Sequence, residues 1–248
     1  MRGNLITYFP RYWMVAFAGA SLAYGNAYIN RFQVASFVFL GIFSVYNRYL
    51  SLESKYGVKG KLMIISLLIA CLSVSIQQIA SPVLLFSLII SGMLGFFYSQ
   101  RLPIIGIALR DIPGLKTVLV VGVWTYVTCL LPVLMGSNVH SIKEYALPGL
   151  FILAISLLFD LRDREIDDAS RKTIPQLLGV LATKIVVVVL LIIYIFLIHI
   201  TEIQVDKIWV YSAVIILLVL LVWFKNTKSN YYASLLEFTL MVLGVGYW

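Results

Sequence analysis

The sequence is poor in the residues from which most soluble catalytic and metal sites are built. It has two cysteines, two histidines and eleven acidic residues among 248, and charged residues make up 12% of the chain. Cys71 and Cys129 both fall within apolar segments, where cysteine is usually a small core residue, so we expect neither a disulfide framework nor a thiolate metal site. His140 and His199 stand at the ends of apolar segments with no partner at ligand spacing, which argues against zinc and haem.

Apolar residues are correspondingly abundant. They account for 61% of the chain, whereas a soluble domain is nearer half apolar and about twice as charged. Several stretches approach or exceed the length of about 20 apolar residues that crosses a bilayer. We therefore expect an all-α integral membrane protein with nine transmembrane helices, the first a retained span rather than a signal peptide. The expected spans are Tyr12–Ile29, Phe32–Leu50, Leu62–Ile79, Pro82–Tyr98, Thr117–Met135, Tyr145–Phe159, Leu181–Ile200, Ile208–Phe224 and Tyr231–Trp248.

The basic residues favour one orientation of these spans. If the N-terminus is cytoplasmic, sixteen of the nineteen lysines and arginines fall at cytoplasmic ends of spans, and Arg31, Lys143 and Lys207 remain on the other side. The net charge of +8 then follows from membrane topology and does not indicate nucleic-acid binding.

The acidic residues are concentrated in one stretch. Five of the eleven lie between Asp160 and Asp168, directly after the apolar run that ends at Phe159. In a helix Asp160, Asp163 and Asp167 stand at i, i+3 and i+7, so their carboxylates share one face and repel one another. Oxygen ligands suit Mg²⁺, which typically binds through one or two carboxylates plus substrate phosphates. We predict a divalent-cation site that receives a diphosphate; the alternative is a solvated polar loop between two membrane helices.

Two more polar clusters lie at expected cytoplasmic ends. In the cluster that closes the second span, Asn47 is the plausible oxygen ligand, although a helix end with a basic anchor explains the cluster equally well. The connection after the fourth span carries Arg101, Arg110 and Lys116, which could hold diphosphate oxygens, although ordinary anchoring explains any one of them alone. Its apolar middle, Ile104–Leu109, suggests a short interfacial or lid helix.

Two ionisable residues and many aromatic ones lie near the same ends. Lys184 and Glu237 fall within the seventh and ninth spans, where an ionisable group is functional by default, but both are shallow enough for their side chains to reach the interface. We interpret most of the aromatic residues as an interfacial belt. Some could line a pocket for an allylic cation, whose charge an aromatic face stabilises.

The stretch from Asp160 to Pro175, DLRDREIDDASRKTIP, resembles the second aspartate-rich motif of the UbiA-type intramembrane prenyltransferases. The pattern of that motif is D-x-x-D-x-x-x-D, followed by a short stretch and T-L-P. Nine spans, with motifs at the ends of the second and sixth, also match the family architecture. The stretch YSQRL, which begins at Tyr98, resembles the family's Tyr-Ser-x-x-Leu, and Lys116 falls where the family has a diphosphate-binding basic residue. The likeness covers nearly the whole chain and is specific at the second motif.

The first aspartate-rich motif of the family, N-D-x-x-D-x-x-x-D, is altered in this chain. Asn47 matches, but Arg48, Ser51 and Lys55 occupy the three aspartate positions. In the family each motif helps to hold one Mg²⁺ on the prenyl diphosphate, so one of the two metals has few ligands here. Either Arg48 or Lys55 replaces that cation with a fixed positive charge, or catalysis has been lost and the scaffold binds a lipid or a partner protein.

The resemblance implies a single UbiA-like transmembrane domain over residues 1–248, with a central cavity open to the cytoplasm and laterally to lipid. Together with the distribution of basic residues, it predicts a multi-pass protein of the bacterial inner membrane, with the N-terminus and the aspartate motif on the cytoplasmic side. The expected activity is Mg²⁺-dependent transfer of a prenyl group from a polyprenyl diphosphate to a lipophilic or aromatic acceptor. Asp160, Asp163 and Asp167 would hold the metal and act in catalysis. The expected substrate contacts are Asn47, Arg48, Tyr98, Arg101, Arg110, Lys116 and Lys172.

Two other functions fit the sequence less well. A catalytically inactive UbiA-like membrane subunit, bound to a lipid or a protein, would explain the altered first motif. A transporter is the weakest candidate, because the charges sit at one membrane face and form no relay at the midplane.

Overall fold

The computed structural model describes residues 5–27, 31–52, 90, 98, 106–134, 142–164, 173–201, 203–224 and 230–247. In that part of the chain the secondary structure is helical and contains no strand, as the long apolar segments predict. The elements are α1 (Leu5–Asn26), α2 (Arg31–Leu52), η1 (Leu109–Asp111), α5 (Leu115–Thr125), η2 (Tyr126–Leu130), α6 (Leu131–Leu134), α7 (Ile142–Asp163), α8 (Ile174–Leu178), α9 (Val180–Ile200), α10 (Lys207–Trp223) and α11 (Asn230–Gly246).

Two stretches of helix within the described residues are long and apolar enough to cross a membrane. One is the 20-residue run Leu115–Leu134, formed by α5, η2 and α6, and the other is the 21-residue α9. Apolar helices of 10 to 17 residues are Arg31–Phe43, Lys207–Trp223 and Tyr232–Gly246. The count of nine spans stays a prediction, since the spans expected at Leu62–Ile79 and Pro82–Tyr98 lie almost wholly outside the described residues.

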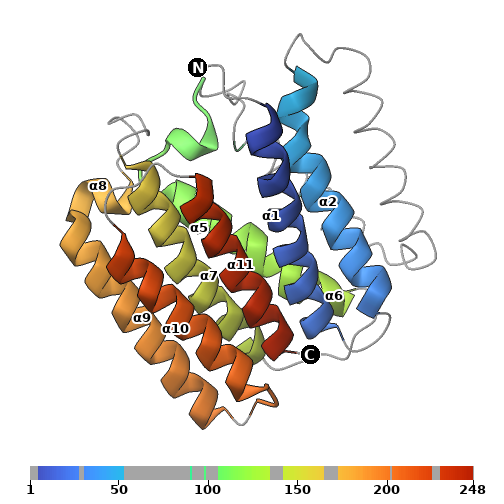
Figure 1. The fold of residues 1–248 in the computed structure, drawn as a ribbon, viewed down its shortest axis with the longest axis vertical. Coiled ribbons are helices and arrows are strands. Elements are labelled where there is room, and N and C mark those ends of the chain that lie inside the picture. Colours follow the sequence, from blue (N-terminus) through green and yellow to red (C-terminus); the bar gives the residue numbers. More distant parts are fainter. Residues whose placement is uncertain are drawn as a thin grey trace.

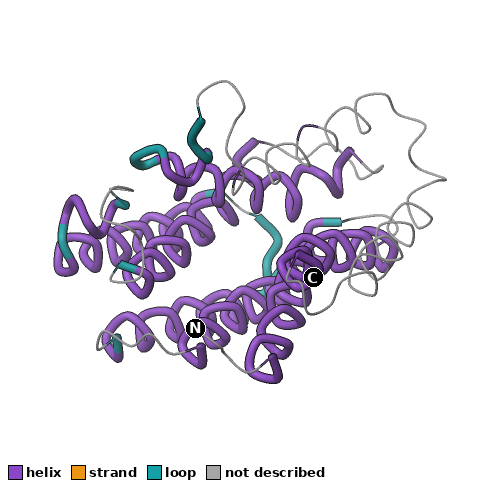
Figure 2. Tube along the Cα trace, turned by 90° about the horizontal axis from the view of Figure 1, so that it is seen from above, coloured by secondary structure: helices purple, strands orange, loops and turns teal. Residues whose placement is uncertain are grey.

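The helices pack in two facing rows. In one row α1 packs against α2 and α11, and α11 packs against α10; in the other, α7 lies between α5 and α9. Figure 1 shows the helices from the side, and Figure 2 looks down on them from above. The main core is formed by buried apolar side chains of α1, α7, α9, α10 and α11, which join the two rows. A smaller core joins α1 and α2 to the start of α6.

The helix ends alternate between the two ends of the bundle. Lys116 at the start of α5 contacts Asp160 at the end of α7, and the amide of Asp206, just before α10, donates to the carbonyl of Gly246 at the end of α11. Figure 1 shows the start of α1 and the end of α11 at opposite ends of the molecule. The first turn of α5 and the last turn of α7 therefore meet at the end of the bundle where α1 begins.

The run α5–η2–α6 contains one wide turn. η2 is a π-helical turn in which the amide of Leu131 donates to the carbonyl of Tyr126, five residues earlier. Pro132 follows directly; it has no N–H to donate to the carbonyl of Thr128 and cannot continue a regular helix without strain. π turns of this kind are typically single insertions within an α-helix and often lie near functional sites.

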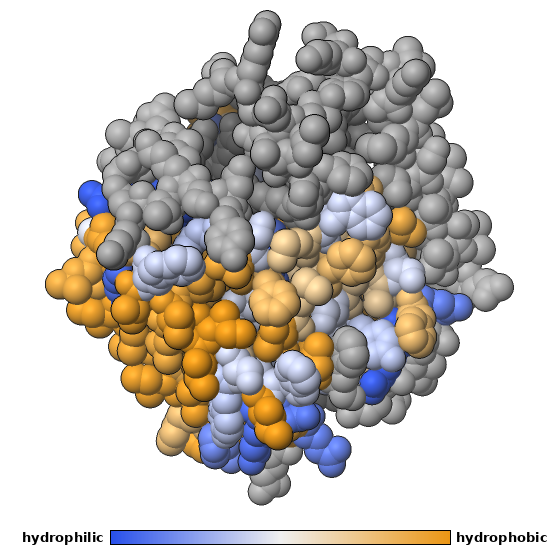
Figure 3. All heavy atoms as spheres, viewed as in Figure 1, coloured by the Kyte–Doolittle hydropathy of each residue, from blue (hydrophilic) through white to orange (hydrophobic). Residues whose placement is uncertain are grey.

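The outward face of α9 is apolar. Its large hydrophobic residues, spaced mostly by three or four positions, are 41–73% exposed, so they form a stripe that turns away from the core. Figure 3 shows apolar side chains gathered over the part of the surface where α9 and α10 lie. An exposed stripe of this size is typical of a helix that faces lipid or a partner and not water. The exposed residues are Leu181, Ile185, Val189, Ile192, Ile193, Phe196 and Ile200.

Candidate functional site

The last turn of α7 carries the first two aspartates of the acidic stretch. The apolar segment ends at Phe159, but α7 continues to Asp163, so Asp160 and Asp163 stand one helical turn apart. Both line a pocket of about 230 Å³, and Asp160 is only 3% exposed. The end of α7 is joined to α8 by Gln176, whose amide donates to the carbonyl of Arg164 at 3.4 Å. The acidic stretch therefore begins as the wall of a pocket and not as a solvated loop.

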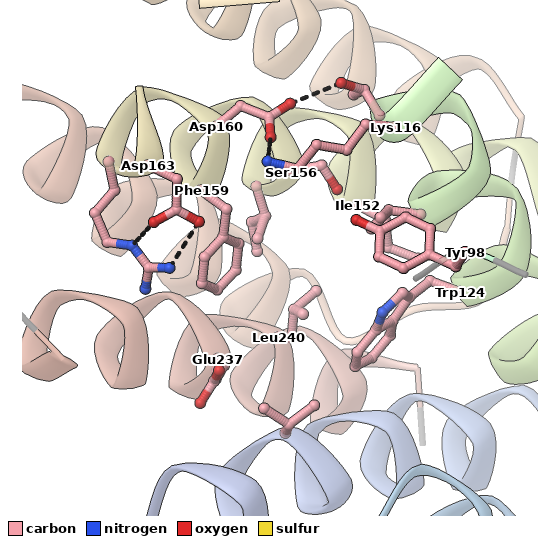
Figure 4. Close-up of a pocket in the computed structure, with 15 residues that line it drawn as sticks. Tyr98, Lys116, Trp124, Ile152, Ser156, Phe159, Asp160, Asp163, Glu237 and Leu240 are labelled. Carbon is pink, nitrogen blue, oxygen red and sulfur yellow. Dashed lines mark hydrogen bonds and ion pairs between the residues drawn. The ribbon is translucent and has the colours of Figure 1, made fainter. Parts of the chain in front are cut away.

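Asp160 is held by two consecutive residues of α5. Lys116 Nζ lies 2.8 Å from Oδ1 of Asp160, and Thr117 Oγ1 donates to Oδ2 at 2.7 Å. Gly114, which precedes α5, has a φ of 71°, a conformation that glycine adopts at little cost, and it places both residues in the first turn of the helix. Figure 4 shows Lys116 and Asp160 side by side across α5 and α7. The buried carboxylate thus has both a counter-charge and a neutral donor.

Asp163 is held by its neighbour Arg162. Nε of Arg162 donates to Oδ1 at 2.7 Å and Nη2 donates to Oδ2 at 2.9 Å, which is the bidentate geometry of a guanidinium on a carboxylate. Arg162 is buried, and its guanidinium carbon lies 5.2 Å from the centroid of the Phe159 ring. The remaining nitrogen, Nη1, is buried and has no hydrogen-bond partner in the described part of the chain. Because the guanidinium is planar, Nη1 points away from Asp163 and could donate to an anionic ligand.

The other walls of the pocket are mainly apolar and aromatic. α1 and α11 close the side that faces α7, and Tyr98 and Trp124 stand together at one edge (Figure 4). Glu237 lies across the pocket from Asp160 and is 3% exposed. The lining residues that the structure describes are Val15, Tyr98, Lys116, Thr117, Val120, Trp124, Ile152, Ile155, Ser156, Phe159, Asp160, Arg162, Asp163, Glu237 and Leu240.

Asp160 and Asp163 are the residues of the pocket that could hold Mg²⁺. The described lining carries two cationic and three carboxylate side chains, so the formal charge of that part of the lining is negative. Two carboxylates one turn apart supply the one or two protein ligands that Mg²⁺ uses when substrate phosphates complete its coordination. No group of three or more His, Cys, Asp and Glu side chains that could hold a metal occurs within the described ranges, and Asp167 lies outside them.

Ten residues were predicted from the sequence to form the site. The structure describes the side chains of four of them, Asp160, Asp163, Tyr98 and Lys116, and all four line the same pocket. The side chains of Asn47, Arg48, Arg101, Arg110, Asp167 and Lys172 lie outside the description, so the predictions for them remain untested.

One local prediction was wrong in the part that the structure describes. The apolar stretch Ile104–Leu109 does not end as a helix: Gly106 adopts a φ of 68°, and a single 3₁₀ turn begins at Leu109. A positive φ breaks the repeating backbone geometry of a helix, and glycine accepts it readily. This connection therefore enters α5 through turns and not through an interfacial helix.

The two ionisable residues whose role the sequence left open lie in different surroundings. Glu237 lines the pocket, whereas Lys184 is not among its described lining residues. Nζ of Lys184 lies 3.5 Å from the carbonyl of Phe224 and 5.5 Å from the centroid of its ring, at the C-terminal end of α10. A cation near the last carbonyls of a helix is stabilising there. Among the described residues, Lys184 thus contacts the end of α10 and not the pocket.

The sequence predicts no role for three polar residues of the pocket, Thr117, Ser156 and Arg162. Thr117 is the first residue of an expected apolar span, and its position next to Lys116 is the available signal. Arg162 is a basic residue between the aspartates. Consecutive residues of a helix do not face one another, so a pair between Arg162 and Asp163 was not expected; the long arginine side chain makes it possible.

Comparisons with known proteins identify no relative of this chain. No family model, no curated protein and no solved structure matches it. The geometry of the pocket, together with the resemblance of the aspartate-rich stretch, is therefore the basis for a functional proposal.

Proposed function

We propose that this protein is an intramembrane prenyltransferase, which uses Mg²⁺ and a polyprenyl diphosphate to prenylate a lipophilic or aromatic acceptor. The observation that supports this function best is the contact between Lys116 and Asp160. These residues are distant in the sequence, and the resemblance assigns them separately to diphosphate binding and metal binding. They lie 2.8 Å apart in the wall of one pocket, where a metal diphosphate needs both.

The polar wall of the pocket suits the leaving group of such a reaction. As the bond between the prenyl carbon and the diphosphate oxygen breaks, the diphosphate leaves with the electron pair. Lys116 and Nη1 of Arg162 are placed to stabilise the negative charge that develops on it, and Asp160 and Asp163 would hold Mg²⁺, which supplies further charge neutralisation. The acceptor then forms a bond to the same carbon and loses a proton.

The aromatic wall suits the prenyl group. Trp124, Tyr98 and Phe159 line the pocket beside the charged residues, and an aromatic face attracts the allylic cation that forms when diphosphate departs. The apolar residues of α1 and α11 keep water from this cation, which would otherwise capture it.

The membrane arrangement is part of this proposal. Nine spans with the N-terminus in the cytoplasm place the end of α7 at the cytoplasmic surface, where Mg²⁺ and soluble diphosphates are found. The apolar outer face of α9 and the alternating helix ends of the bundle are consistent with this arrangement. A pocket at that end could take the diphosphate from the cytoplasm and the prenyl tail from the lipid.

The experiment that tests the function is binding of farnesyl and geranylgeranyl diphosphate to the purified protein, in Mg²⁺ or in EDTA. We expect binding that requires Mg²⁺ and that Asp160→Asn and Asp163→Asn each weaken by about tenfold or more, because a charged ligand of the metal is lost. Asp206→Asn is the matched control. Asp206 is an exposed N-cap of α10 at the other end of the bundle, and asparagine caps a helix equally well.

A second pair of variants tests the basic side of the pocket. Lys116→Gln should weaken diphosphate binding by about tenfold or more, because a phosphate oxygen loses a charged partner. Lys184→Gln removes a lysine near the same end of the bundle, but one that contacts Phe224, and should leave diphosphate binding intact. Absence of Mg²⁺-dependent binding in folded wild-type protein would refute the prenyltransferase proposal.

An inactive membrane subunit is the second candidate function. Arg48, Ser51 and Lys55 at the aspartate positions of the first motif favour it, since they remove the usual ligands of one metal. Folded protein that binds no prenyl diphosphate and co-purifies with a stable protein partner would support this alternative.

A further inference from the structure

Arg162 divides its hydrogen-bond donors between a neighbouring residue and the pocket. Its side chain lines the pocket and is only 8% exposed. Nε and Nη2 donate to the two oxygens of Asp163 (Figure 4), whereas Nη1 is buried and has no hydrogen-bond partner in the described part of the chain. A buried guanidinium N–H without a partner is costly, so its presence in a pocket wall indicates a ligand that accepts a hydrogen bond from it.

The surroundings of Arg162 keep its guanidinium close to both the pocket and Asp163. Arg162 lies in the last turn of α7, where the helix end favours a cation. Phe159, one turn earlier on the same side of the helix, presents its ring 5.2 Å from the guanidinium carbon and also lines the pocket. The long side chain can therefore turn its guanidinium from Asp163 towards a ligand in the pocket while the helix stays in place.

The contact with Arg162 changes what Asp163 can do as a metal ligand. Both oxygens of Asp163 accept from the guanidinium, so a positive charge already lies against this carboxylate. A free Mg²⁺ bound to Asp163 would meet that charge at short range, and two cations repel strongly where water is partly excluded. Asp160, one turn earlier, likewise contacts Lys116 at 2.8 Å. Cationic side chains of the protein thus compete with a metal for the two carboxylates that would hold it.

A diphosphate removes this competition at Asp163. Phosphate oxygens accept the paired hydrogen bonds of a guanidinium as a carboxylate does. Arg162 can then donate to the phosphate, and Asp163 becomes available to Mg²⁺, which is typically bound by one or two carboxylates together with substrate phosphates. The buried guanidinium has an anionic partner before and after this exchange, so neither state leaves it as an unpaired buried charge.

We infer that Arg162 exchanges Asp163 for a phosphate oxygen, so that the pocket takes Mg²⁺ and the diphosphate together and discriminates against free Mg²⁺. This inference rests on the proposed prenyltransferase function. It specifies the form of the first substrate, a metal complex of the diphosphate, and the residue that selects this form. Arg162 contacts the diphosphate directly and acts on the metal through Asp163, for which it is a positioning residue.

The test measures two dissociation constants on the purified full-length chain. The first is for Mn²⁺ in the absence of diphosphate; Mn²⁺ stands in for Mg²⁺, and its unbound concentration is read by electron paramagnetic resonance. The second is for geranylgeranyl diphosphate in saturating Mg²⁺, measured by calorimetry. Both are determined for wild-type protein, Arg162→Gln and Arg162→Lys. Arg164→Gln is the matched control, because it removes the same charge two residues later from a side chain that is exposed and not among the described lining residues.

Arg162→Gln should have opposite effects on the two constants. We expect it to tighten Mn²⁺ binding by about tenfold or more, because the cation that competes for Asp163 is gone. It should weaken binding of the diphosphate by about tenfold or more, because a phosphate oxygen loses a charged partner. Loss of folded protein would weaken both, so it cannot imitate this result. Arg162→Lys retains the charge and should keep the weak Mn²⁺ binding of wild type, and Arg164→Gln should change either constant by less than about twofold.

The two measurements also separate this inference from the function on which it rests. If geranylgeranyl diphosphate binds to wild-type protein but Arg162→Gln leaves Mn²⁺ binding unchanged or weaker, the exchange at Asp163 is wrong and the prenyltransferase proposal stands. Tightening of Mn²⁺ binding by Arg164→Gln to the same extent would also overturn the exchange, since the effect would then follow from net charge. If the diphosphate does not bind to wild-type protein, the prenyltransferase proposal fails and this inference fails with it.

Discussion

The buried carboxylate of Asp160 contacts Lys116 and Thr117, which are both in the first turn of α5. Thr117 therefore matters more for this site than its position at the start of an apolar segment suggests. Thr117 Oγ1 donates to Oδ2 of Asp160 at 2.7 Å, and both side chains are buried. The hydroxyl therefore supplies the hydrogen bond to Oδ2, the carboxylate oxygen of Asp160 that Lys116 does not contact.

Thr117→Val should lower the stability of the protein by about 1–3 kcal/mol, because it leaves a buried carboxylate oxygen without its donor. The measurement is the apparent melting temperature in detergent. Thr128→Val is the control: Thr128 is also buried, but its hydroxyl donates to the carbonyl of Trp124 within the same helix. Equal losses in the two variants would contradict a special role for Thr117.

At the residue scale, the sequence predicted the members of the site better than their pairing. The spacing of Asp160 and Asp163 placed both on one face of a helix, and both line the pocket. Nothing in the sequence linked Lys116 to Asp160 in space, because that contact depends on how α5 packs against α7. Whether the side chain of Glu237 lines a site or extends to the membrane interface also depends on the packing of α11. Hydrophobic periodicity alone does not determine that packing.

At the scale of the elements, the contact between α1 and α11 depends on a glycine. A Cβ at Gly244 would lie 2.6 Å from the backbone carbon of Ser21 and 2.7 Å from the backbone nitrogen of Leu22, distances that real Cβ atoms do not reach. The same contact is strengthened by Ser21, whose hydroxyl donates to the carbonyl of Met241 at 3.0 Å. Small residues permit this close approach of helix backbones within membranes.

Gly244→Ala should force α1 and α11 apart and lower stability by about 1–3 kcal/mol, the usual range for overpacking. The apparent melting temperature in detergent again provides the measurement. Gly122→Ala is the matched control, because a Cβ at Gly122 in α5 meets nothing within 4 Å and alanine has the higher helix propensity. A Gly244→Ala variant as stable as Gly122→Ala would show that the backbones can separate without loss.

Element boundaries were the less predictable part of the fold. The apolar segments located the long described helices but not the short α8, and they did not show that α7 continues through Asp163 or that α1 begins at Leu5. Hydropathy marks where lipid ends, whereas a helix ends where its backbone hydrogen bonds end. Polar residues that line a pocket can continue a helix beyond its apolar part, and those of α7 do so.

At the scale of the whole molecule, the proposed topology makes opposite predictions for the two ends of α9. Arg164, which follows α7, and Gln204, which follows α9, are both exposed and should lie on opposite sides of the membrane. Cysteines are introduced at these positions one at a time, in a chain with Cys71 and Cys129 replaced by alanine. A membrane-impermeant maleimide applied to intact cells should label Gln204→Cys, and should label Arg164→Cys only after the membrane is opened. The reverse pattern would invert the orientation, and labelling of both from one side would exclude α9 as a span.

The wide turn η2 has a consequence for how this chain can change. A π turn holds one residue more than an α turn within the same turn of helix, so the extra residue is absorbed there. Trp124, before the turn, lines the pocket, and Leu131, after it, lies in the core between α1 and α2. Loss of a single residue within Tyr126–Leu130 would convert the π turn to an α turn and leave both halves of the helix facing their present neighbours. Loss of a residue from the α-helical part on either side would instead rotate everything beyond it by about 100°.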